Sequence, residues 1–238
     1  PAQADDLDTL IANADSARAT FDEEASNKAY MALWGYVENN PEAAPAAKLA
    51  LAEAALTYAE MRRFEYGQSD TTPEKKRSLG AEIDKAAGTG HDALKSLEDT
   101  SEKFRIQADL YATMIRTKYH GKRYAKRMDK AMEKALELDP KNYKAYVTAC
   151  KRPLFATEKY GGDLDKAMEL LAKSLELAPG YERGLVMRGI AYEKLGDLDK
   201  AKADWNKVLS ANPNSRSAKE NLERIAKGEP VADFDPGE

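Results

Sequence analysis

The chain has 238 residues, 33% of them charged, and a formal net charge of -4. This length can bury a substantial core, the apolar runs are too short to cross a membrane, and the acidic balance disfavours a dedicated nucleic-acid-binding protein. Cys150 is the single cysteine, which excludes a disulfide within the chain and favours a packed, structural role for its side chain.

Apolar side chains recur at three- and four-residue spacing through nearly the whole chain. This pattern predicts amphipathic helices and leaves almost no segment typical of a strand. In chain order, the predicted helices cover 4–20, 24–39, 43–66, 73–97, 101–119, 123–138, 142–158, 163–177, 181–195, 197–210 and 214–227. Pro73 follows two threonines and precedes Glu74, as expected in the first turn of a helix. We therefore expect an all-α fold.

The first hundred residues form the irregular part of the predicted fold. Within 43–97 the repeat pattern described below is weak, and we expect Gly88-Thr89-Gly90 to interrupt a helix. We accordingly divide the chain into an irregular helical region at 1–100, a repeat region with a capping helix at 101–228 and an acidic flexible tail at 229–238. The first two regions are expected to be continuous.

A seven-residue segment recurs in similar form toward the carboxyl end, at 134–140, 173–179 and 207–213. Each copy begins with a lysine and ends with a proline. A twelve-residue interval also recurs, from Ala29 to Pro41, Met128 to Pro140, Ala167 to Pro179 and Ala201 to Pro213. Four residues into each interval stands a large apolar side chain: Leu33, Met132, Leu171 or Trp205. Such pairs lie one turn apart on one helix face, so the first residue lets a partner helix approach and the second fills the gap.

The repeats are not uniform in length. Pro140 and Pro179 are 39 residues apart, whereas Pro179 and Pro213 are 34 apart. The excess falls at 152–163, where Pro153 and the pair Gly161-Gly162 stand, and we expect a bulge or a longer turn there.

The last repeat, with Leu185, Gly189, Tyr192, Ala201, Trp205 and Pro213 at their present spacing, resembles the 34-residue tetratricopeptide pattern. Tyr119 stands nine residues before Met128, as Tyr192 does before Ala201. The resemblance implies an all-α, right-handed solenoid of about five helix pairs, closed by a capping helix at 214–227. It also implies a surface that holds partners rather than an active site.

Signals of catalysis are scarce. His91 and His120 are the only histidines and lie in unrelated segments, which excludes a multi-histidine metal site and disfavours a histidine-based triad. Neither Gly88-Thr89-Gly90 nor Gly161-Gly162 has the residues of a phosphate-binding loop around it. We predict no enzyme, no catalytic residue, no metal and no cofactor. A helical hydrolase or transferase remains an alternative class without a supporting constellation.

Charge is polarised along the chain. Residues 1–60 carry eleven acids against three bases, and 116–134 carry eight bases against two acids. The candidate basic patch comprises Arg116, Lys118, Lys122, Arg123, Lys126 and Arg127. A solvated elbow between helices is the simplest interpretation; an acidic protein partner or self-association into a homo-oligomer is the alternative, and nucleic acid is the least favoured.

First helices of tetratricopeptide pairs usually line the concave binding groove. The corresponding positions here are Tyr111, Ile115, Lys144, Val147, Lys151, Arg183, Val186, Ile190 and Glu193. Val186 and Ile190 stand where arrays that clamp a peptide's terminal carboxylate resemble one another in having lysine and asparagine, which disfavours such a clamp here. We expect instead a mixed apolar and aromatic groove with basic edges. The alternative is that these side chains pack against neighbouring helices.

Aromatic side chains gather near the expanded repeat. Tyr143, Tyr146, Phe155, Tyr160 and Tyr181 form a candidate pocket for a hydrophobic ligand. Packing between repeats is the alternative role for these rings.

The phrase Tyr160-Gly-Gly-Asp163-Leu-Asp-Lys166-Ala167, together with the Lys-Ala-Leu-Glu-Leu-Asp-Pro punctuation, resembles bacterial extracytoplasmic tetratricopeptide proteins. The T component of tripartite ATP-independent periplasmic (TRAP) transporters is the most similar type, and the regulator-of-microtubule-dynamics family is a looser one. The resemblance implies a non-catalytic adaptor that is periplasmic and often lipid-anchored. It would hold a peptide, a partner subunit or a hydrophobic small molecule in its groove.

Location follows less directly from the residues. The chain begins at Pro1, and we expect that a leader preceded it; an anchor of this family would need a cysteine upstream. A cytoplasmic location is the alternative. The alternative function is a self-associating scaffold that uses the basic elbow at 116–134.

Overall fold

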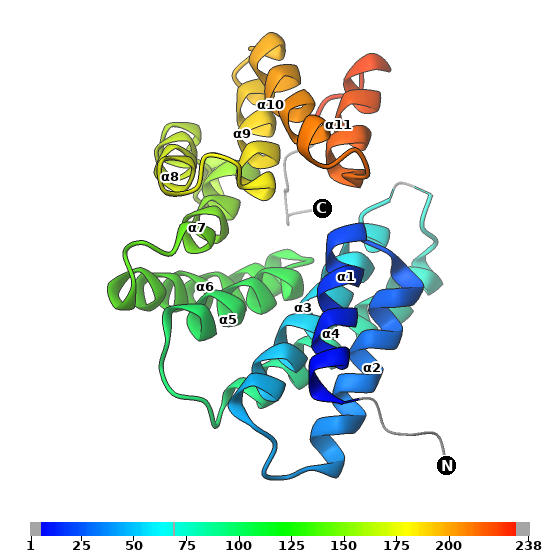
Figure 1. Ribbon diagram of the computed structural model, residues 1–238. Helices are drawn as coiled ribbons and strands as arrows, with labels where there is room; N and C mark the ends of the chain where they lie inside the picture. Colours follow the sequence, from blue (N-terminus) through cyan, green and yellow to red (C-terminus); the bar gives the residue numbers. More distant parts are fainter. Residues whose placement is uncertain (1–5, 69, 232–238) are drawn as a thin grey trace. The chain divides into compact units, whose positions relative to one another are not determined.

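The computed structural model describes residues 6–68 and 70–231, which contain helices and no β-strand. The prediction of an all-α fold is confirmed, and the helices follow one another as hairpins (Figure 1). They are α1 Leu7–Thr20, α2 Glu23–Asn39, α3 Pro45–Tyr66, α4 Pro73–Leu94, α5 Ser101–Met114, α6 Lys118–Leu138, α7 Tyr143–Phe155, α8 Leu164–Leu177, α9 Glu182–Lys194, α10 Leu198–Ala211 and α11 Arg216–Ala226, with a short 3₁₀ helix, η1 Glu158–Tyr160, before α8.

The chain divides into two compact units. Unit 1 comprises 1–99, 106–116 and 120–128, and unit 2 comprises 100–105, 117–119 and 129–238. The division runs through α5 and α6, which contribute residues to both units. Each unit has a hydrophobic core of its own.

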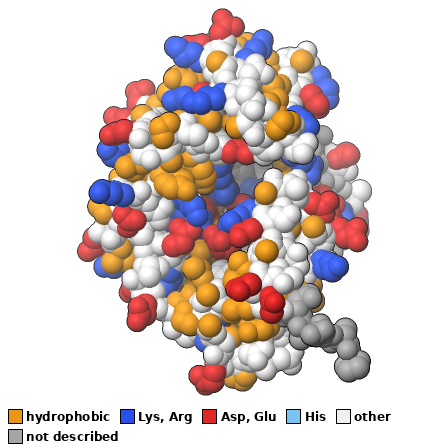
Figure 2. Space-filling view, viewed as in Figure 1, with side chains coloured by type: hydrophobic (Ala, Val, Ile, Leu, Met, Phe, Trp, Pro, Cys, Tyr) orange, Lys and Arg blue, Asp and Glu red, His pale blue; other side chains and the backbone are white. Residues whose placement is uncertain are grey.

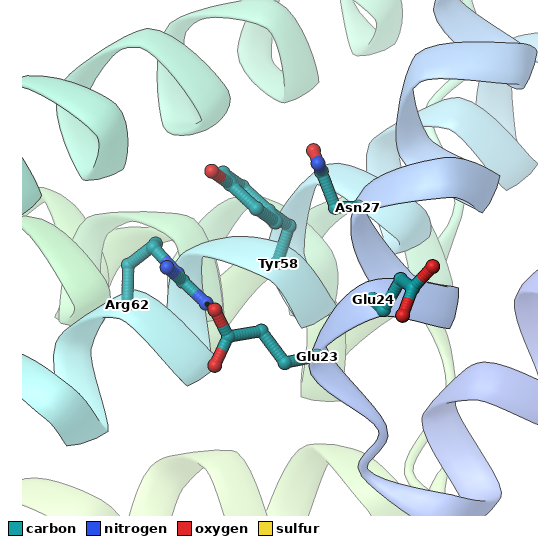
Figure 3. Close-up of a pocket in the computed structure, with 5 residues that line it drawn as sticks. All are labelled: Glu23, Glu24, Asn27, Tyr58 and Arg62. Carbon is teal, nitrogen blue, oxygen red and sulfur yellow. Dashed lines mark ion pairs between the residues drawn. The ribbon is translucent and has the colours of Figure 1, made fainter.

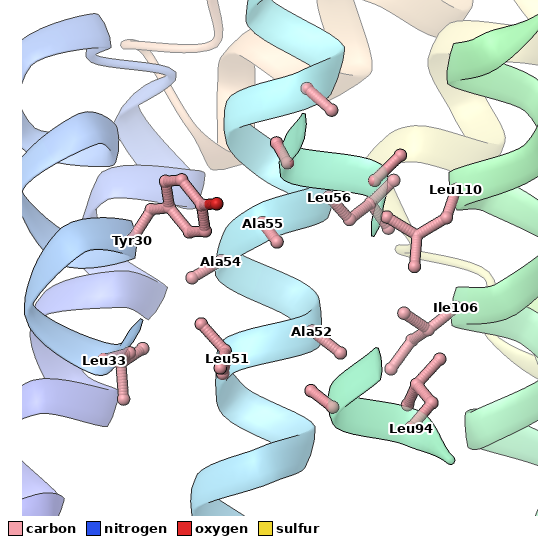
Figure 4. Close-up of a cluster of buried hydrophobic side chains, with 14 of the residues drawn as sticks. Tyr30, Leu33, Leu51, Ala52, Ala54, Ala55, Leu56, Leu94, Ile106 and Leu110 are labelled. Atoms are coloured by element: carbon pink, nitrogen blue, oxygen red, sulfur yellow. The ribbon is translucent and has the colours of Figure 1, made fainter. Parts of the chain in front are cut away.

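The core of unit 1 lies where α3 meets α2, α4 and the second half of α5 (Figure 4). Small side chains of α3, among them Ala52, Ala55 and Ala59, are fully buried and let neighbouring helices approach closely. Larger groups fill the spaces between them, and Leu33 of α2 and Ile83 of α4 are also fully buried. Dense packing of this kind is the main source of helix stability in such a fold.

Capping side chains start the helices of unit 1. Asp6 accepts from the Thr9 amide at 2.8 Å, and Asp22 accepts from the Ala25 amide at 2.7 Å. Thr72 caps α4, whose first residue is Pro73, as the sequence predicts. Each cap supplies a partner for an amide that the helix itself leaves unpaired.

The expected interruption at Gly88-Thr89-Gly90 is wrong, because α4 continues through it to Leu94. An ideal Cβ on Gly90 would lie 2.8 Å from Leu110 Cδ1 of α5, whereas one on Gly88 would meet nothing within 4 Å. Gly90 therefore serves close packing between helices rather than a break. The free-energy cost of a glycine inside a helix is smaller than the stabilisation that the apolar burial around it provides.

The boundary between α5 and α6 also differs from the prediction. The break falls at 115–117, not at 120–122, so Gly121 lies inside α6. An ideal Cβ on Gly121 would be in ordinary contact with Ile115 Cγ2, at 3.9 Å, so close packing does not require a glycine at this position.

Unit 2 contains the hairpins α7–α8 and α9–α10, followed by α11. Ala201 and Trp205 are fully buried, and the indole Nε1 donates to the Val186 carbonyl at 3.1 Å. An ideal Cβ on Gly189 would lie 2.6 Å from Cε2 of that indole. The small-and-large pairing expected from the repeat is thus present, with Gly189 of the partner helix as a second small residue.

The expanded turn is present at 156–163, as predicted. Gly161 follows the end of η1 with a φ of 96°, which favours glycine, and the Asp163 amide donates to the Pro153 carbonyl at 2.8 Å. A side chain on Gly162 would collide with the backbone, since its ideal Cβ would lie 2.9 Å from the Thr157 carbonyl carbon. The two glycines therefore fix the shape of the loop.

Candidate functional site

A ladder of contacts joins the first turns of successive first helices in unit 2. The N-cap residue of each helix contacts the first residue of the preceding one: Asn142 Nδ2 donates to Ser101 Oγ at 2.8 Å, and Ser215 Oγ donates to Glu182 Oε1 at 2.6 Å. At the intermediate step, the Tyr181 ring packs edge-on against Tyr143, with centroids 4.8 Å apart. Within unit 2, the ladder sets the spacing between the first turns of these helices.

The first rung also carries charge. Glu102 accepts from Arg105 at 2.8 Å and from Lys144 at 3.3 Å. Burial alone would raise the pKa of the Glu102 carboxyl, but hydrogen bonding and the two cations hold that pKa below its ordinary value. Glu102 therefore remains an anion at neutral pH.

A buried ion pair holds the α9–α10 hairpin. Arg188 contacts Asp204 through two hydrogen bonds of 2.7 Å, and Asp204 is buried. This hydrogen bonding raises the pKa of the Arg188 guanidinium. Two parallel bonds fix the orientation of both groups, which gives the hairpin one register.

A second ion pair closes the carboxyl end of unit 2. Glu193 of α9 pairs with Arg224 of α11, and the Glu193 side chain is 8% exposed. Both groups also reach the chain beyond α11: Arg224 donates to the Glu229 carbonyl at 2.8 Å, and Glu193 accepts from the Val231 amide at 3.1 Å. The capping helix is therefore bonded to α9 and to the segment that follows it.

The predicted groove residues fall into two groups. Tyr111 and Ile115 belong to unit 1, and Lys144, Val147, Lys151, Arg183, Val186, Ile190 and Glu193 belong to unit 2. Three of the unit 2 side chains, Val147, Val186 and Ile190, are buried in its core. These three side chains therefore pack between helices, which is the alternative given for the groove residues in the sequence analysis. Lys144, Lys151 and Arg183 stay partly exposed on α7 and α9.

The five aromatic residues make separate contacts. Tyr143 packs on Tyr181, and the Tyr146 hydroxyl donates to the Pro140 carbonyl at 3.0 Å. Phe155 lies under the Lys194 ammonium, 5.9 Å from the ring centroid, and Tyr160 lies under that of Lys159, at 5.5 Å. The Tyr143–Tyr181 pair belongs to the ladder, so at least these two rings have a packing role.

The basic patch is divided by burial. Arg116 lies inside unit 1, where its guanidinium donates to Asp84 at 2.7 Å. Lys118 is exposed at the start of α6, and Lys122, Arg123, Lys126 and Arg127 are exposed farther along the same helix. On the face of the molecule in Figure 2, acidic and basic side chains are interspersed with apolar ones.

Unit 1 contains an open pocket of ≈ 310 Å³, lined by polar residues, that sequence reasoning did not predict (Figure 3). Glu23, Glu24 and Asn27 of α2 line it together with Tyr58 and Arg62 of α3. Arg62 is ion-paired with Glu23, and Figure 3 shows these two side chains pointing toward each other. No spacing within one helix reveals such a site, because its two sides come from different helices.

The chemistry of this pocket is that of a paired charge cluster. The Tyr58 hydroxyl donates to Glu82 at 2.8 Å, and burial, together with that carboxylate, raises the pKa of Tyr58 to about 12. Arg62 has further carboxylate partners in Glu65, at 3.3 Å, and Glu82, at 3.9 Å. Since the phenol stays protonated at neutral pH, it is not a general base there.

His91 is the most strongly shifted histidine in the part of the chain that the structure describes. Burial lowers its pKa to about 4, and its ring lies against Tyr111 with centroids 4.3 Å apart. Its two ring nitrogens are buried and form no hydrogen bond to described residues. A neutral imidazole without partners is a packing group in this setting. Within 6–68 and 70–231, no cluster of three or more potential metal ligands is present.

Stacked helix hairpins, a ladder between first helices and a capping helix define an all-α repeat solenoid. The comparison with protein families agrees: residues 182–215 match the tetratricopeptide repeat. The matched residues form α9, α10 and the turn that leads to α11. None of the described helices is long and apolar enough to cross a membrane.

Curated relatives match the repeat part alone. The FK506-binding protein-like protein of Rattus norvegicus is 51% identical over 51 residues, or 21% of this chain and 15% of that protein. Its human counterpart is 39% identical over 64 residues, which cover 27% of this chain and 18% of that protein. Human peptidyl-prolyl cis-trans isomerase FKBP4 is 43% identical over 56 residues, which cover 24% of this chain and 12% of that protein. The chain spans less than a fifth of each of these relatives.

A solved structure is similar in fold over nearly the whole chain. It is a thermophilic tetratricopeptide-repeat protein of Thermus thermophilus, with a TM-score of 0.63 and 16% sequence identity. The match covers 93% of this chain and all of that one. At this identity the likeness concerns the fold, and it extends the solenoid class to the irregular first hundred residues.

Proposed function

We propose that the protein is a non-catalytic adaptor that binds a protein or peptide partner through the first helices of unit 2. The carrying observation is the repeat at 182–215, which the contact ladder joins to α7 on one side and to α11 on the other. Arrays of this kind expose the same face of successive first helices, and a partner can contact several of them at once. The partly exposed Lys144, Lys151 and Arg183 give that face basic edges.

Site-specific photo-crosslinking tests the proposal. A photo-reactive amino acid is placed at Lys151 of α7 or Arg183 of α9, and the matched control positions are Ala172 of α8 and Ala203 of α10, both exposed on second helices. In cells that produce the protein, we expect discrete covalent adducts from the two first-helix positions and far fewer from the controls. Equal adduct patterns from first and second helices would contradict the proposal.

A narrower form of the proposal gives the adaptor a place and a cargo. In this form it works outside the cytoplasm beside a TRAP-type transporter and holds a partner subunit or a hydrophobic small molecule. The support is the resemblance of the phrase at 160–167, which covers the end of the expanded turn and the first residues of α8. Native mass spectrometry of the purified protein tests the small molecule: a retained ligand mass supports this form, and an apo mass alone counts against it.

The second candidate function is a self-associating scaffold that uses the basic elbow. Its support is the row of exposed cations Lys122, Arg123, Lys126 and Arg127 on α6. Exposed charges are screened by salt, so such association should weaken strongly between low and high ionic strength. Analytical ultracentrifugation of the Arg123→Glu/Arg127→Glu variant tests this function, and we expect its self-association to be weakened. Association that is unchanged in the variant and independent of salt would exclude the elbow as the contact.

A further inference from the structure

The chain reverses direction after α11 and returns to α9. Gly228 adopts a φ of 71°, its amide donates to the Ile225 carbonyl at 2.9 Å, and the Glu229 amide donates to the Arg224 carbonyl at 3.1 Å. A left-handed glycine with two such bonds is the usual way to end a helix in a sharp turn. The three residues that follow, Glu229–Val231, therefore leave α11 in a defined direction.

Glu193 and Arg224 hold this segment by its backbone. The Arg224 guanidinium donates to the carbonyl of Glu229, and the Glu193 carboxylate accepts from the amide of Val231, two residues farther on. The Val231 side chain packs against the core of unit 2. One donor, one acceptor and one apolar contact thus bind three consecutive residues.

Two of these three interactions are independent of side-chain identity. Any extended segment offers a carbonyl and, two residues later, an amide, so Glu193 and Arg224 select for backbone conformation. Specificity comes from the apolar third residue. Because Glu193 and Arg224 also pair with each other, both charges remain compensated when the segment leaves. The site therefore does not depend on one particular occupant.

We propose that this face of α9 and α11 is a peptide-binding site whose resident occupant is the chain's own segment Glu229–Val231. A partner with an extended segment and an aliphatic residue at the third position would displace the resident one. The inference rests on the proposed function and adds a regulatory step to it: the tail competes with the partner. Glu193, one of the predicted groove residues, is shared by both states of the site.

The balance of the competition follows from tethering. A segment joined to its site by a single turn has an effective concentration on the order of millimolar, whereas a free peptide has only its own concentration. A contact of two hydrogen bonds and one aliphatic side chain is weak by itself. The tail should consequently exclude dilute peptides and yield to a partner that also contacts α7 or α9.

Nuclear magnetic resonance of the full chain tests the proposal with a defined probe, the acetylated peptide of sequence 228–238. Val231→Asp removes the apolar contact and adds a charge, and Ala203→Asp places the same charge on the exposed face of α10 as the control. We expect the amide proton and nitrogen signals of residue 231 in Val231→Asp to move to random-coil shifts, because that amide leaves Glu193. They should stay in place in Ala203→Asp.

Peptide titration supplies the second readout. The Val231→Asp protein should bind the peptide at least about tenfold more tightly than the Ala203→Asp protein, because its own tail no longer competes. Glu193→Gln added to Val231→Asp should remove that gain. Unchanged tail shifts, or equal peptide affinity of the two proteins, would overturn the proposal. Tail shifts that depend on protein concentration would also overturn it, since the occupant would then come from a second copy.

The crosslinking experiment separates this inference from the function beneath it. If first-helix adducts form but Val231→Asp gains no peptide affinity, only the resident occupant is wrong. If no first-helix adducts form although the peptide binds, the tail is a structural strap and the proposed adaptor function is wrong.

Discussion

Gly189 lies where α9 meets the indole of Trp205, the largest fully buried side chain of the protein's described part. An ideal Cβ there would lie 2.6 Å from Trp205 Cε2, which is nearer than van der Waals contact. We expect Gly189→Ala to lower the free energy of unfolding by about 1–3 kcal/mol through overpacking. Urea denaturation followed by circular dichroism measures the change.

A double-mutant cycle separates this clash from helix propensity. Trp205→Phe removes the indole nitrogen and its bond to the Val186 carbonyl, so it destabilises the protein by itself. In that background Gly189→Ala should cost clearly less than it does alone, since the clashing atoms are gone. Simple additivity of the two costs would mean that the clash does not explain the effect.

His91 predicts a pH dependence of stability. Its pKa is about 4 in the folded protein and about 6.5 in an unfolded chain, so the unfolded state binds more protons between these values. The stability contributed by neutral His91 is therefore present above pH 6.5 and is lost as pH falls toward 4, by up to about 3 kcal/mol. Asp92, Lys95 and Arg127 are the charged groups that bear on the ring.

The measurement compares unfolding free energies of the natural protein and His91→Leu at several pH values. The free energy of unfolding of His91→Leu minus that of the natural protein should increase as pH falls from 6.5 to 4, because leucine does not titrate. A difference that stays constant over this range would contradict the assigned burial of the imidazole. The sequence could not foresee this burial, since Tyr111, which covers the ring, lies on another helix.

At the scale of helices, most elements were predictable because each carries its own signals. Caps such as Asp22 and Thr72, and prolines between repeats, lie next to the ends that they mark. The continuation of α4 through Gly90 has a long-range cause. Whether Gly90 breaks α4 depends on Leu110, twenty residues away, and local sequence does not contain that contact.

The two glycines of α4 give a matched pair for the element scale. Gly88→Ala should stabilise the protein by about 0.5–1 kcal/mol, because alanine has the higher helix propensity and its Cβ meets nothing within 4 Å. Gly90→Ala should destabilise by about 1 kcal/mol, because the gain is outweighed by crowding against the fully buried Leu110. Thermal unfolding measures the unfolding temperatures of the two variants. Equal shifts of the same sign in these temperatures would show that α4 does not pack as described.

At the scale of the whole molecule, the repeat pattern predicted the solenoid class but not how its surfaces are used. The resemblance to the tetratricopeptide pattern placed Val186 and Ile190 on a binding face, with packing against neighbouring helices as the alternative, and the structure buries both in the core of unit 2. Their burial depends on the helices packed around α9, which a single repeat does not specify. The return of the chain to Glu193 through Val231 is likewise a contact across 38 residues. Position within a repeat therefore predicts the packing of a helix better than the exposure of its outer face.

A repeat array also predicts how a local defect spreads. Stability in such an array is a sum of intrinsic and nearest-neighbour terms, so damage should decline with distance along the stack. In Gly189→Ala, amide hydrogen exchange should accelerate in α9 and α10, which form one hairpin, and less in α7 and α8. Exchange in α3 and α4, whose core is that of unit 1, should change least. Mass spectrometry of exchanged peptides measures all three pairs in one experiment, and an equal acceleration everywhere would mean that the two cores unfold as a single cooperative body.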